Sequence, residues 1–360
     1  MKYFILLFSC IGLLLLSNCE SEDSKPSQRR KTNPVKFDTP TNNTSVKKGE
    51  GLPITVEISD LNEIKHLKIF TRDTVLFDGV PTQNQESVTL LTSNSRLGSK
   101  QISLHATLKN GEIRKDNRII RILSDIYPTD YKAEVVNIFP HRTSSYTQGL
   151  EFDNGQLYEG TGGMGSSGGK SKLLKVDYKT GEVLKDHLLD PSYFGEGITI
   201  FGDQIYQLTW QQNKCFVYDK HTFELVNTFN YSGEGWGLCN DGTHLIMSDG
   251  SERLYYRDPN TFGLVKTIEV YSNAGPMQKL NELEYIDGKI YANVYLSNNI
   301  LKINPNTGAV EAIIDASLIA LEHKKGGDVL NGIAYKRDEK RLFITGKNWP
   351  SLLEIELVQL

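Results

Sequence analysis

A pattern that occurs five times is the feature that most constrains the fold of this 360-residue chain. Each copy begins with a small or polar residue, continues through an apolar pair and a Gly-, Asp- or Asn-rich turn, and ends in a second apolar strand. The copies are QGLEFDNGQLYEGTG from Gln148, EGITIFGDQIYQLTW from Glu196, WGLCNDGTHLIMSDG from Trp236, NELEYIDGKIYANVY from Asn281 and NGIAYKRDEKRLFITGK from Asn331. The first four are each followed by a second hairpin pattern. Four strands that recur every 40 to 50 residues or so are typical of a propeller blade.

The end of the chain indicates how such a ring closes. The fifth copy is followed by one further strand pattern, over residues 352–357, so its blade lacks a strand. A strand pattern over 133–139, upstream of the first copy, can supply it and leave no unpaired sheet edge. We therefore predict an all-β chain in which residues 131–360 form a five-bladed β-propeller.

Residues 34–125 have a different pattern, of short alternating strands separated by turns. Asn110-Gly111 marks a hairpin turn between the strand patterns 102–108 and 118–123. Strands and turns at this spacing predict an immunoglobulin-like β-sandwich. The segment holds no cluster of catalytic residue types, so we interpret it as a spacer or interaction domain.

The start of the chain has the features of an export and anchoring segment. A basic residue is followed by an apolar run over 3–16 and by Leu16-Ser17-Asn18-Cys19, which is similar to the lipobox of bacterial lipoproteins. We predict a signal peptide over 1–19, a lipid on Cys19 and a flexible tether over 20–33. This places the protein at the periplasmic or outer-membrane side of a bacterial membrane. Because Asn18 replaces the usual Gly or Ala, an ordinary secretory signal or an uncleaved anchor is the alternative.

Composition restricts the partners. With 40 basic and 44 acidic residues the net charge is −4, which gives no basic surface for nucleic acid. We expect a monomer. Beyond the leader the cysteines are Cys215 and Cys239, which an exported protein could pair, although buried free thiols fit their spacing as well. Neither Cys nor His has a spacing that predicts a zinc site.

The alignment of the copies also indicates where a functional site lies. The innermost strand of each propeller blade lines the central channel, so the first positions of the copies meet at one mouth. The next column is glycine in four of the five copies, which the close approach of strands near the axis explains. The first column instead presents polar and aromatic groups, which together predict a pocket. Its members are Gln148, Glu196, Trp236, Asn281 and Asn331.

Glu196 is the one ionisable residue of the first column. A carboxyl group among apolar rings and glycine backbone has a raised pKa, which suits it to exchange protons near neutral pH. The residues alone leave other roles open, in which Glu196 pairs with an arginine or with a structural cation in the channel. They also leave open a propeller that binds a peptide or glycan without reaction, and a lactonase- or lyase-like enzyme, which would generally need a channel metal.

Short motifs along residues 139–350 carry a family resemblance. Among them are Tyr146-Thr147-Gln148-Gly149-Leu150, Phe194-Gly195-Glu196-Gly197, Gln207-Leu208-Thr209-Trp210, Gly235-Trp236-Gly237-Leu238, Leu280-Asn281-Glu282-Leu283-Glu284-Tyr285 and Thr345-Gly346-Lys347-Asn348-Trp349-Pro350. In this order they resemble the plant- and bacterial-type glutaminyl-peptide cyclotransferases. The resemblance implies a five-bladed propeller that needs no cofactor for catalysis. It also implies conversion of the N-terminal glutamine of a peptide or protein to pyroglutamate, with release of ammonia.

The resemblance further assigns roles to individual residues. Glu196 matches the catalytic acid of the family. The positions that match its substrate pocket are Gln148, Asn281 and Lys347, with Tyr146, Trp210, Trp236 and Tyr295 as aromatic walls. Tyr295 stands where the family commonly has tryptophan and Tyr146 where it has phenylalanine, so both positions keep an aromatic face.

Overall fold

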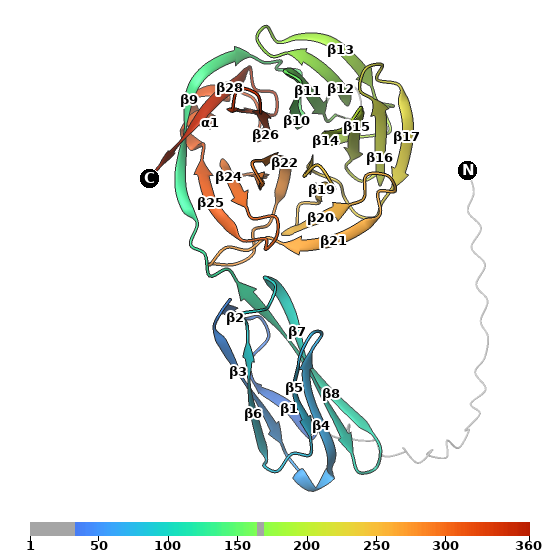
Figure 1. Ribbon diagram of the computed structural model, residues 1–360, viewed down its shortest axis with the longest axis vertical. Helices are drawn as coiled ribbons and strands as arrows, with labels where there is room; N and C mark the ends of the chain where they lie inside the picture. Colours follow the sequence, from blue (N-terminus) through green and yellow to red (C-terminus); the bar gives the residue numbers. More distant parts are fainter. Residues whose placement is uncertain (1–32, 164–168) are drawn as a thin grey trace, which may run out of the picture.

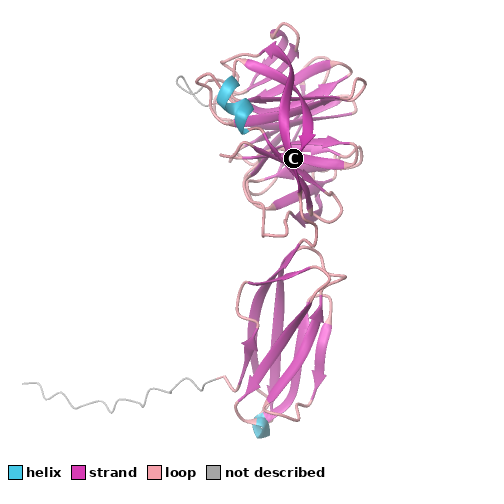
Figure 2. Ribbon diagram, turned by 90° about the vertical axis from the view of Figure 1, so that its left-hand side faces the viewer, coloured by secondary structure: helices cyan, strands magenta, loops and turns pink. Residues whose placement is uncertain are grey.

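The computed structural model describes residues 33–163 and 169–360, whose strands fall into two regions. An N-terminal two-sheet domain extends from the edge of a ring of strands, as Figures 1 and 2 show. The predicted signal peptide, the lipidation site Cys19 and most of the tether lie outside the described residues. None of the helices in the described range is long and apolar enough to cross a membrane.

The two-sheet domain consists of a sheet of order β1-β3-β6 and a sheet of order β2-β8-β7-β4-β5 around one apolar core. Along β3, alternate residues from Leu52 to Ile58 point into that core, because side chains alternate between the faces of a strand. The bounds are β1 Val35–Thr39, β2 Thr44–Lys47, β3 Gly51–Ile58, η1 Leu61–Glu63, β4 Ile64–Thr71, β5 Val75–Gly79, β6 Gln85–Leu91, β7 Gly98–Leu108 and β8 Ile113–Leu123. The immunoglobulin-like assignment of this domain stays a prediction.

In the part of the ring that the structure describes, the strands form three four-stranded sheets and one eight-stranded sheet. The orders are β10-β11-β12-β13, β14-β15-β16-β17, β18-β19-β20-β21 and β22-β23-β24-β25-β9-β28-β27-β26. In the largest sheet β25 pairs parallel with β9, and this junction separates two further groups of four strands. Figure 1 shows β10, β14, β22 and β26 around the centre of the ring and β13, β17, β21 and β25 on its circumference.

The strands of the ring have the following bounds: β9 Thr129–Pro140, β10 Thr147–Asp153, β11 Gln156–Thr161, β12 Lys172–Asp177, β13 Glu182–Leu188, β14 Gly195–Phe201, β15 Gln204–Thr209, β16 Lys214–Asp219, β17 Leu225–Asn230, β18 Leu238–Asn240, β19 Leu245–Ser248, β20 Arg253–Arg257, β21 Leu264–Glu269, β22 Leu280–Ile286, β23 Lys289–Val294, β24 Asn299–Ile303, β25 Val310–Asp315, β26 Leu330–Lys336, β27 Arg341–Gly346 and β28 Ser351–Gln359. The helix α1, Ser317–His323, connects β25 to β26. This helix was not predicted from the sequence, and its buried residues are Ile319 and Ala320.

Strand β9 connects the two regions and closes the ring. It pairs antiparallel with β28 along nearly its whole length, with Ile138 opposite Leu353. Its first residues also pair parallel with β25, with Thr129 opposite Ala312. The prediction that an upstream strand completes the last blade is confirmed, and this strand is longer than the expected 133–139.

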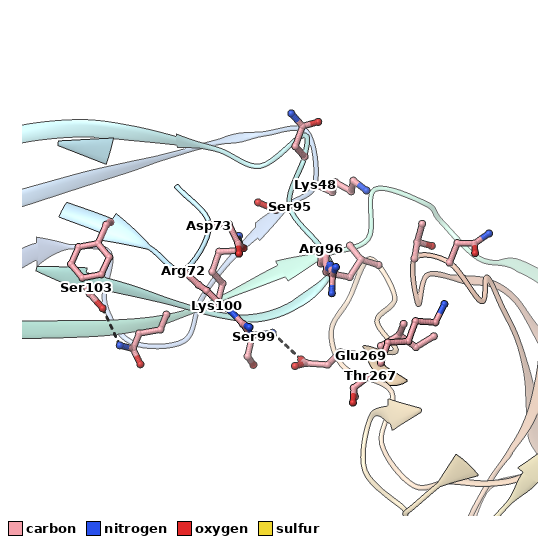
Figure 3. Close-up of a pocket in the computed structure, with 18 residues that line it drawn as sticks. Lys48, Arg72, Asp73, Ser95, Arg96, Ser99, Lys100, Ser103, Thr267 and Glu269 are labelled. Atoms are coloured by element: carbon pink, nitrogen blue, oxygen red, sulfur yellow. Dashed lines mark hydrogen bonds and ion pairs between the residues drawn. The ribbon is translucent and has the colours of Figure 1, made fainter. Parts of the chain in front are cut away.

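The two regions meet at a joint that Figure 3 shows. The Ser99 backbone N–H donates to the Glu269 carboxylate at 2.9 Å. Tyr271 and Ala309 of the ring pack into the apolar core of the two-sheet domain. A cleft of ≈ 1130 Å³ adjoins the joint, and none of the predicted site residues lines it.

The glycine column has the packing role that the sequence analysis assigned to it. A Cβ added to Gly237 would lie 1.9 Å from the Asn281 carbonyl oxygen, and one added to Gly149 would lie 2.4 Å from the Ile198 nitrogen. Gly197 is confined in the same way. Each of these glycines therefore lets its strand contact the backbone of the next innermost strand.

Candidate active site

The first column of the repeat converges at the N-terminal ends of the innermost strands. Gln148 lies on β10, Glu196 on β14 and Asn331 on β26. The Gln148 side-chain amide donates to Glu196 Oε1 at 3.1 Å, and Asn331 Nδ2 donates to Gln148 Oε1 at 3.2 Å. Three consecutive blades of the closed ring therefore contribute to one hydrogen-bonded row that ends on the Glu196 carboxyl group.

Glu196 is buried, with 5% of its surface exposed. Burial raises the pKa of its carboxyl group well above the usual range; the positive charge of Lys347 opposes this rise and the negative charge of Glu234 adds to it. The direction of the shift is the one predicted from the sequence. In this environment the carboxyl group holds a proton more tightly than an ordinary glutamate does.

Lys347 is a buried lysine directly after β27. Its Nζ lies 4.6 Å from the centre of the Tyr146 ring and 5.3 Å from that of Tyr295. Burial lowers the pKa of the ammonium group, whereas the carboxylates of Glu196 and Asp328 act to raise it. The structure thus places a cation between two aromatic faces and close to Glu196.

Aromatic side chains form a row beside these polar groups. Phe194 packs edge-on against Trp210, with ring centres 5.8 Å apart, and Trp236 packs edge-on against Tyr295 at 5.6 Å. Tyr146 also packs edge-on against Phe194, with ring centres 6.3 Å apart. These contacts bring the predicted aromatic residues together. Phe194 was not among the site candidates, although the motif that contains Glu196 includes it.

Two carboxylates of the site were missed by the sequence analysis. Glu234 Oε2 accepts from the indole N–H of Trp210 at 2.8 Å and from that of Trp236 at 2.9 Å. Asp328 accepts from the Tyr146 hydroxyl at 3.3 Å. Neither residue falls in the aligned columns, and the only signal for Glu234 was its place two residues before Trp236.

A buried ion pair supports the segment that carries Tyr146 and Gln148. Glu159 accepts from Thr147 Oγ1 at 2.7 Å, from Ser145 Oγ at 3.2 Å and from His141 Nε2 at 3.2 Å. His141 Nδ1 lies 2.8 Å from the Trp349 carbonyl oxygen, so both ring nitrogens face acceptors. Burial lowers the pKa of His141, but its attraction to Glu159 outweighs burial and the net pKa is raised. The imidazolium form satisfies both acceptors.

The innermost strands carry more acidic groups than the first column suggests. Glu282 occupies the glycine column of the fourth copy, and its carboxylate accepts from the Leu150 N–H at 3.2 Å and the Ile333 N–H at 2.8 Å. Glu151 and Glu284 are also buried. Glu196 is therefore the one acid of the first column but not the one acid of the innermost strands.

The His, Cys, Asp and Glu side chains of the described residues form neither a metal-binding cluster nor a disulfide. Within the described residues, no group of three or more His, Cys, Asp or Glu is placed to hold a metal ion. A structural cation in the channel stays a prediction. Cys215 and Cys239 are both buried and unpaired, so of the two alternatives the structure supports free thiols.

Comparison with known proteins identifies the family. The family model described as glutamine cyclotransferase matches residues 111–357. The chain belongs to this family. A glutaminyl-peptide cyclotransferase of Arabidopsis thaliana is 41% identical over 232 residues, which cover 63% of this chain and 71% of that protein. The crystal structure of Myxococcus xanthus glutaminyl cyclase matches with a TM-score of 0.61 and 35% identity, and covers 65% of this chain and 99% of that one. The resemblance and the all-β propeller fold are thereby confirmed.

Proposed function

We propose that this protein is a glutaminyl-peptide cyclotransferase that acts on the N-terminal glutamine of peptides or proteins. The α-amine nitrogen bonds to the side-chain amide carbon, the bond from that carbon to the amide nitrogen breaks, and ammonia leaves. The observation that carries the proposal is the buried Glu196 carboxyl group, which contacts Gln148 and lies near Lys347 within an aromatic row.

Glu196 moves the proton that this reaction requires. Its carboxylate takes a proton from the substrate amine, and the carboxylic acid then delivers a proton to the departing amide nitrogen. A peptide α-ammonium group has a pKa of roughly 7.7–8.0. Burial raises the pKa of Glu196 above that of an ordinary glutamate, so its carboxylate takes a proton from the substrate amine more readily than an ordinary glutamate would.

The polar groups around Glu196 bind the reacting atoms. The Lys347 ammonium supplies positive charge for the oxyanion that forms when the amine attacks. The side-chain oxygens of Asn281 and Asn331 are buried and have no hydrogen-bond partner among the described residues. These oxygens are acceptors for the N–H groups of the substrate.

The aromatic row limits water and orients the substrate. Trp210, Trp236 and Tyr295 present flat apolar faces next to the polar groups, so a glutamine side chain that folds back on its own amine is shielded from solvent. Water that is kept away cannot hydrolyse the amide in competition with the amine.

Incubation with a Gln-initiated peptide tests the proposal, with ammonia release and loss of the mass of ammonia as readouts. Turnover should persist in EDTA, because side chains carry out every proton transfer. In Glu196→Gln, which keeps the shape but cannot exchange the proton, the rate should fall by about 10²–10⁴-fold. The same peptide with an acetylated N-terminus is the control and should not react.

These measurements test the proton-transfer role of Glu196 and the cyclase activity separately. Full activity of Glu196→Gln would contradict the proton-transfer role. If the wild-type protein leaves several Gln-initiated peptides unchanged, the binding module that recognises a peptide or glycan becomes the better interpretation.

We further propose that the enzyme is attached to a bacterial membrane through a lipid on Cys19, with the tether and the two-sheet domain as a spacer. The sequence Leu16-Ser17-Asn18-Cys19 after an apolar run supports this proposal. In a bacterial expression host, wild-type protein should incorporate a labelled fatty acid and sediment with membranes. Cys19→Ala should do neither, and membrane-bound Cys19→Ala would instead indicate an uncleaved anchor.

A further inference from the structure

We propose that Glu234 is a positioning residue that holds Trp210 and Trp236, from two adjacent blades, in one geometry at the active site. The inference deepens the proposed function and rests on it for its kinetic consequences. Trp210 directly follows β15 and Trp236 lies just before β18, so no continuous strand fixes one indole relative to the other.

The hydrogen bonds of Glu234 fix that relation. A single oxygen, Oε2, accepts from both indole N–H groups at 2.8 and 2.9 Å. Its other oxygen accepts from Gln211 Nε2 at 2.9 Å, which orients the carboxylate. The indole N–H is the only hydrogen-bond donor of a tryptophan side chain, and in both tryptophans it donates to Glu234.

Glu234 also lies at the middle of the aromatic row. On one side Trp210 packs against Phe194, and on the other Trp236 packs against Tyr295. Loss of the shared acceptor would leave two indole N–H groups without their partner and would free both rings to rotate. The spacing between the two halves of the aromatic row would then no longer be set.

The charge of Glu234 reaches the catalytic carboxyl group as well. Burial acts to raise the pKa of Glu234, but the hydrogen bonds from Gln211 and from the two indoles outweigh it, so the group is ionised. Its negative charge contributes to the raised pKa of Glu196, against the opposing charge of Lys347. Among the described residues, the charge of Glu196 also acts on the hydroxyl groups of Tyr146 and Tyr231.

Two substitutions separate orientation from charge. Glu234→Gln keeps an oxygen for both indoles, and the Gln211 amide can turn to offer its own oxygen to the new NH₂ group. Glu234→Ala removes both the acceptor and the charge. Glu182→Gln, on an exposed position of the outer strand β13, removes one charge elsewhere and is the matched control.

Kinetics on a Gln-initiated peptide provide the first readout. We expect kcat/KM to fall about 10–100-fold in Glu234→Ala and to stay within about 3-fold of wild type in Glu234→Gln at the pH optimum. In Glu234→Gln the acid limb of the pH profile should move to lower pH, because loss of a nearby negative charge lowers the pKa of Glu196. An unmoved acid limb would overturn the charge effect.

Tryptophan fluorescence provides a readout that needs no turnover. The chain has 3 tryptophans, and Trp349 is fully buried. Acrylamide should quench Glu234→Ala more strongly than wild type, whereas Glu234→Gln and Glu182→Gln should resemble wild type. Wild-type quenching and wild-type kcat/KM in a folded Glu234→Ala would overturn the proposal. If the wild-type enzyme has no cyclase activity, the proposed function fails, but quenching still shows whether Glu234 holds the indoles.

If Glu234→Ala does not fold, Gln211→Ala replaces it, because this change leaves Glu234 in place but removes the hydrogen bond that orients its carboxylate. We then expect increased quenching and a smaller loss of kcat/KM, of about 3–10-fold. Unchanged values of both quantities would contradict the positioning role.

Discussion

Replacement of Glu159 by glutamine should destabilise the ring, and more at pH 6 than at pH 9. Glu159 is 1% exposed and accepts hydrogen bonds from His141, Thr147 and Ser145. Removal of one partner of a buried ion pair typically costs about 3–5 kcal/mol. Because the glutamine oxygen can still accept a hydrogen bond from Thr147 or Ser145, we expect the free energy of unfolding to fall by about 3 kcal/mol, at the lower end of that range. In a domain of this size that loss lowers Tm by roughly 6–12 °C.

The pH dependence follows from the two pKa shifts. The pKa of His141 is raised above its ordinary value of 6.5, so its contribution to stability is present below pH 6.5 and is lost as the pH rises through the folded-state pKa. The attraction of His141 holds the pKa of Glu159 below its ordinary value of 4.5 despite burial, so the contribution of Glu159 is lost only as the pH falls below 4.5. In Glu159→Gln, burial without a counter-charge lowers the pKa of His141. The stability gap should therefore be widest between roughly pH 5 and 6.5 and should narrow toward pH 9.

Denaturation monitored by tryptophan fluorescence measures the difference in unfolding free energy between wild type and Glu159→Gln. The signal reports on the ring because Trp210, Trp236 and Trp349 all lie there. The double variant His141→Gln/Glu159→Gln should lose the pH dependence and recover part of the stability, since it leaves no unpaired buried charge. The exposed-site variant Glu182→Gln should match wild type. A loss in Glu159→Gln that is the same at pH 6 and pH 9, or one below about 1 kcal/mol, would refute the ion-pair assignment.

Other contacts lead to further predictions. Gly237→Ala should prevent folding or lower the free energy of unfolding by more than about 3 kcal/mol, because the added Cβ would lie 1.9 Å from the Asn281 carbonyl oxygen. Gly263→Ala is the control and should change thermal stability little, because the nearest atom to its added Cβ is a side-chain oxygen at 3.2 Å. Tyr146→Phe should lower kcat/KM by about 2–10-fold through loss of the bond to Asp328, and an unchanged value would show that this hydroxyl is dispensable. Burial raises the pKa of the Cys215 and Cys239 thiols, so Ellman's reagent should modify neither in the native protein and both after unfolding; rapid modification of the native protein would contradict their burial.

Local patterns were enough to predict most of the ring. A hairpin can be predicted from residues that are neighbours in the sequence, so the repeated turn patterns predicted the strands from β10 to β28. Alignment of these patterns also revealed the glycine column, which lets the innermost strands approach one another. Even the closing strand β9 could be predicted, because one blade lacked a strand and closed sheets avoid free edges. Short elements without such a pattern, such as β2 and α1, were not predicted.

Some residues of the candidate active site could be predicted from the sequence and others could not. Glu196, Gln148 and Lys347 were predicted because motifs carried them, and the structure places them close together. Glu234 and Asp328 were missed because their roles depend on contacts between segments far apart in the chain, as between Tyr146 and Asp328. Glu282 was seen only as a departure from the glycine column, and the sequence could not show that its carboxylate caps backbone N–H groups of two other blades.

The position of β9 has a consequence for how the chain is made. Its last residue, Pro140, leaves the ribosome long before the first residue of its partner β28, Ser351. At translation rates of about 5–20 residues per second, β9 waits roughly 10–40 s for that partner. During this interval the nascent chain carries a strand edge that only its own C-terminus can cover. The ring can therefore close only once β28, Ser351–Gln359, has been synthesised.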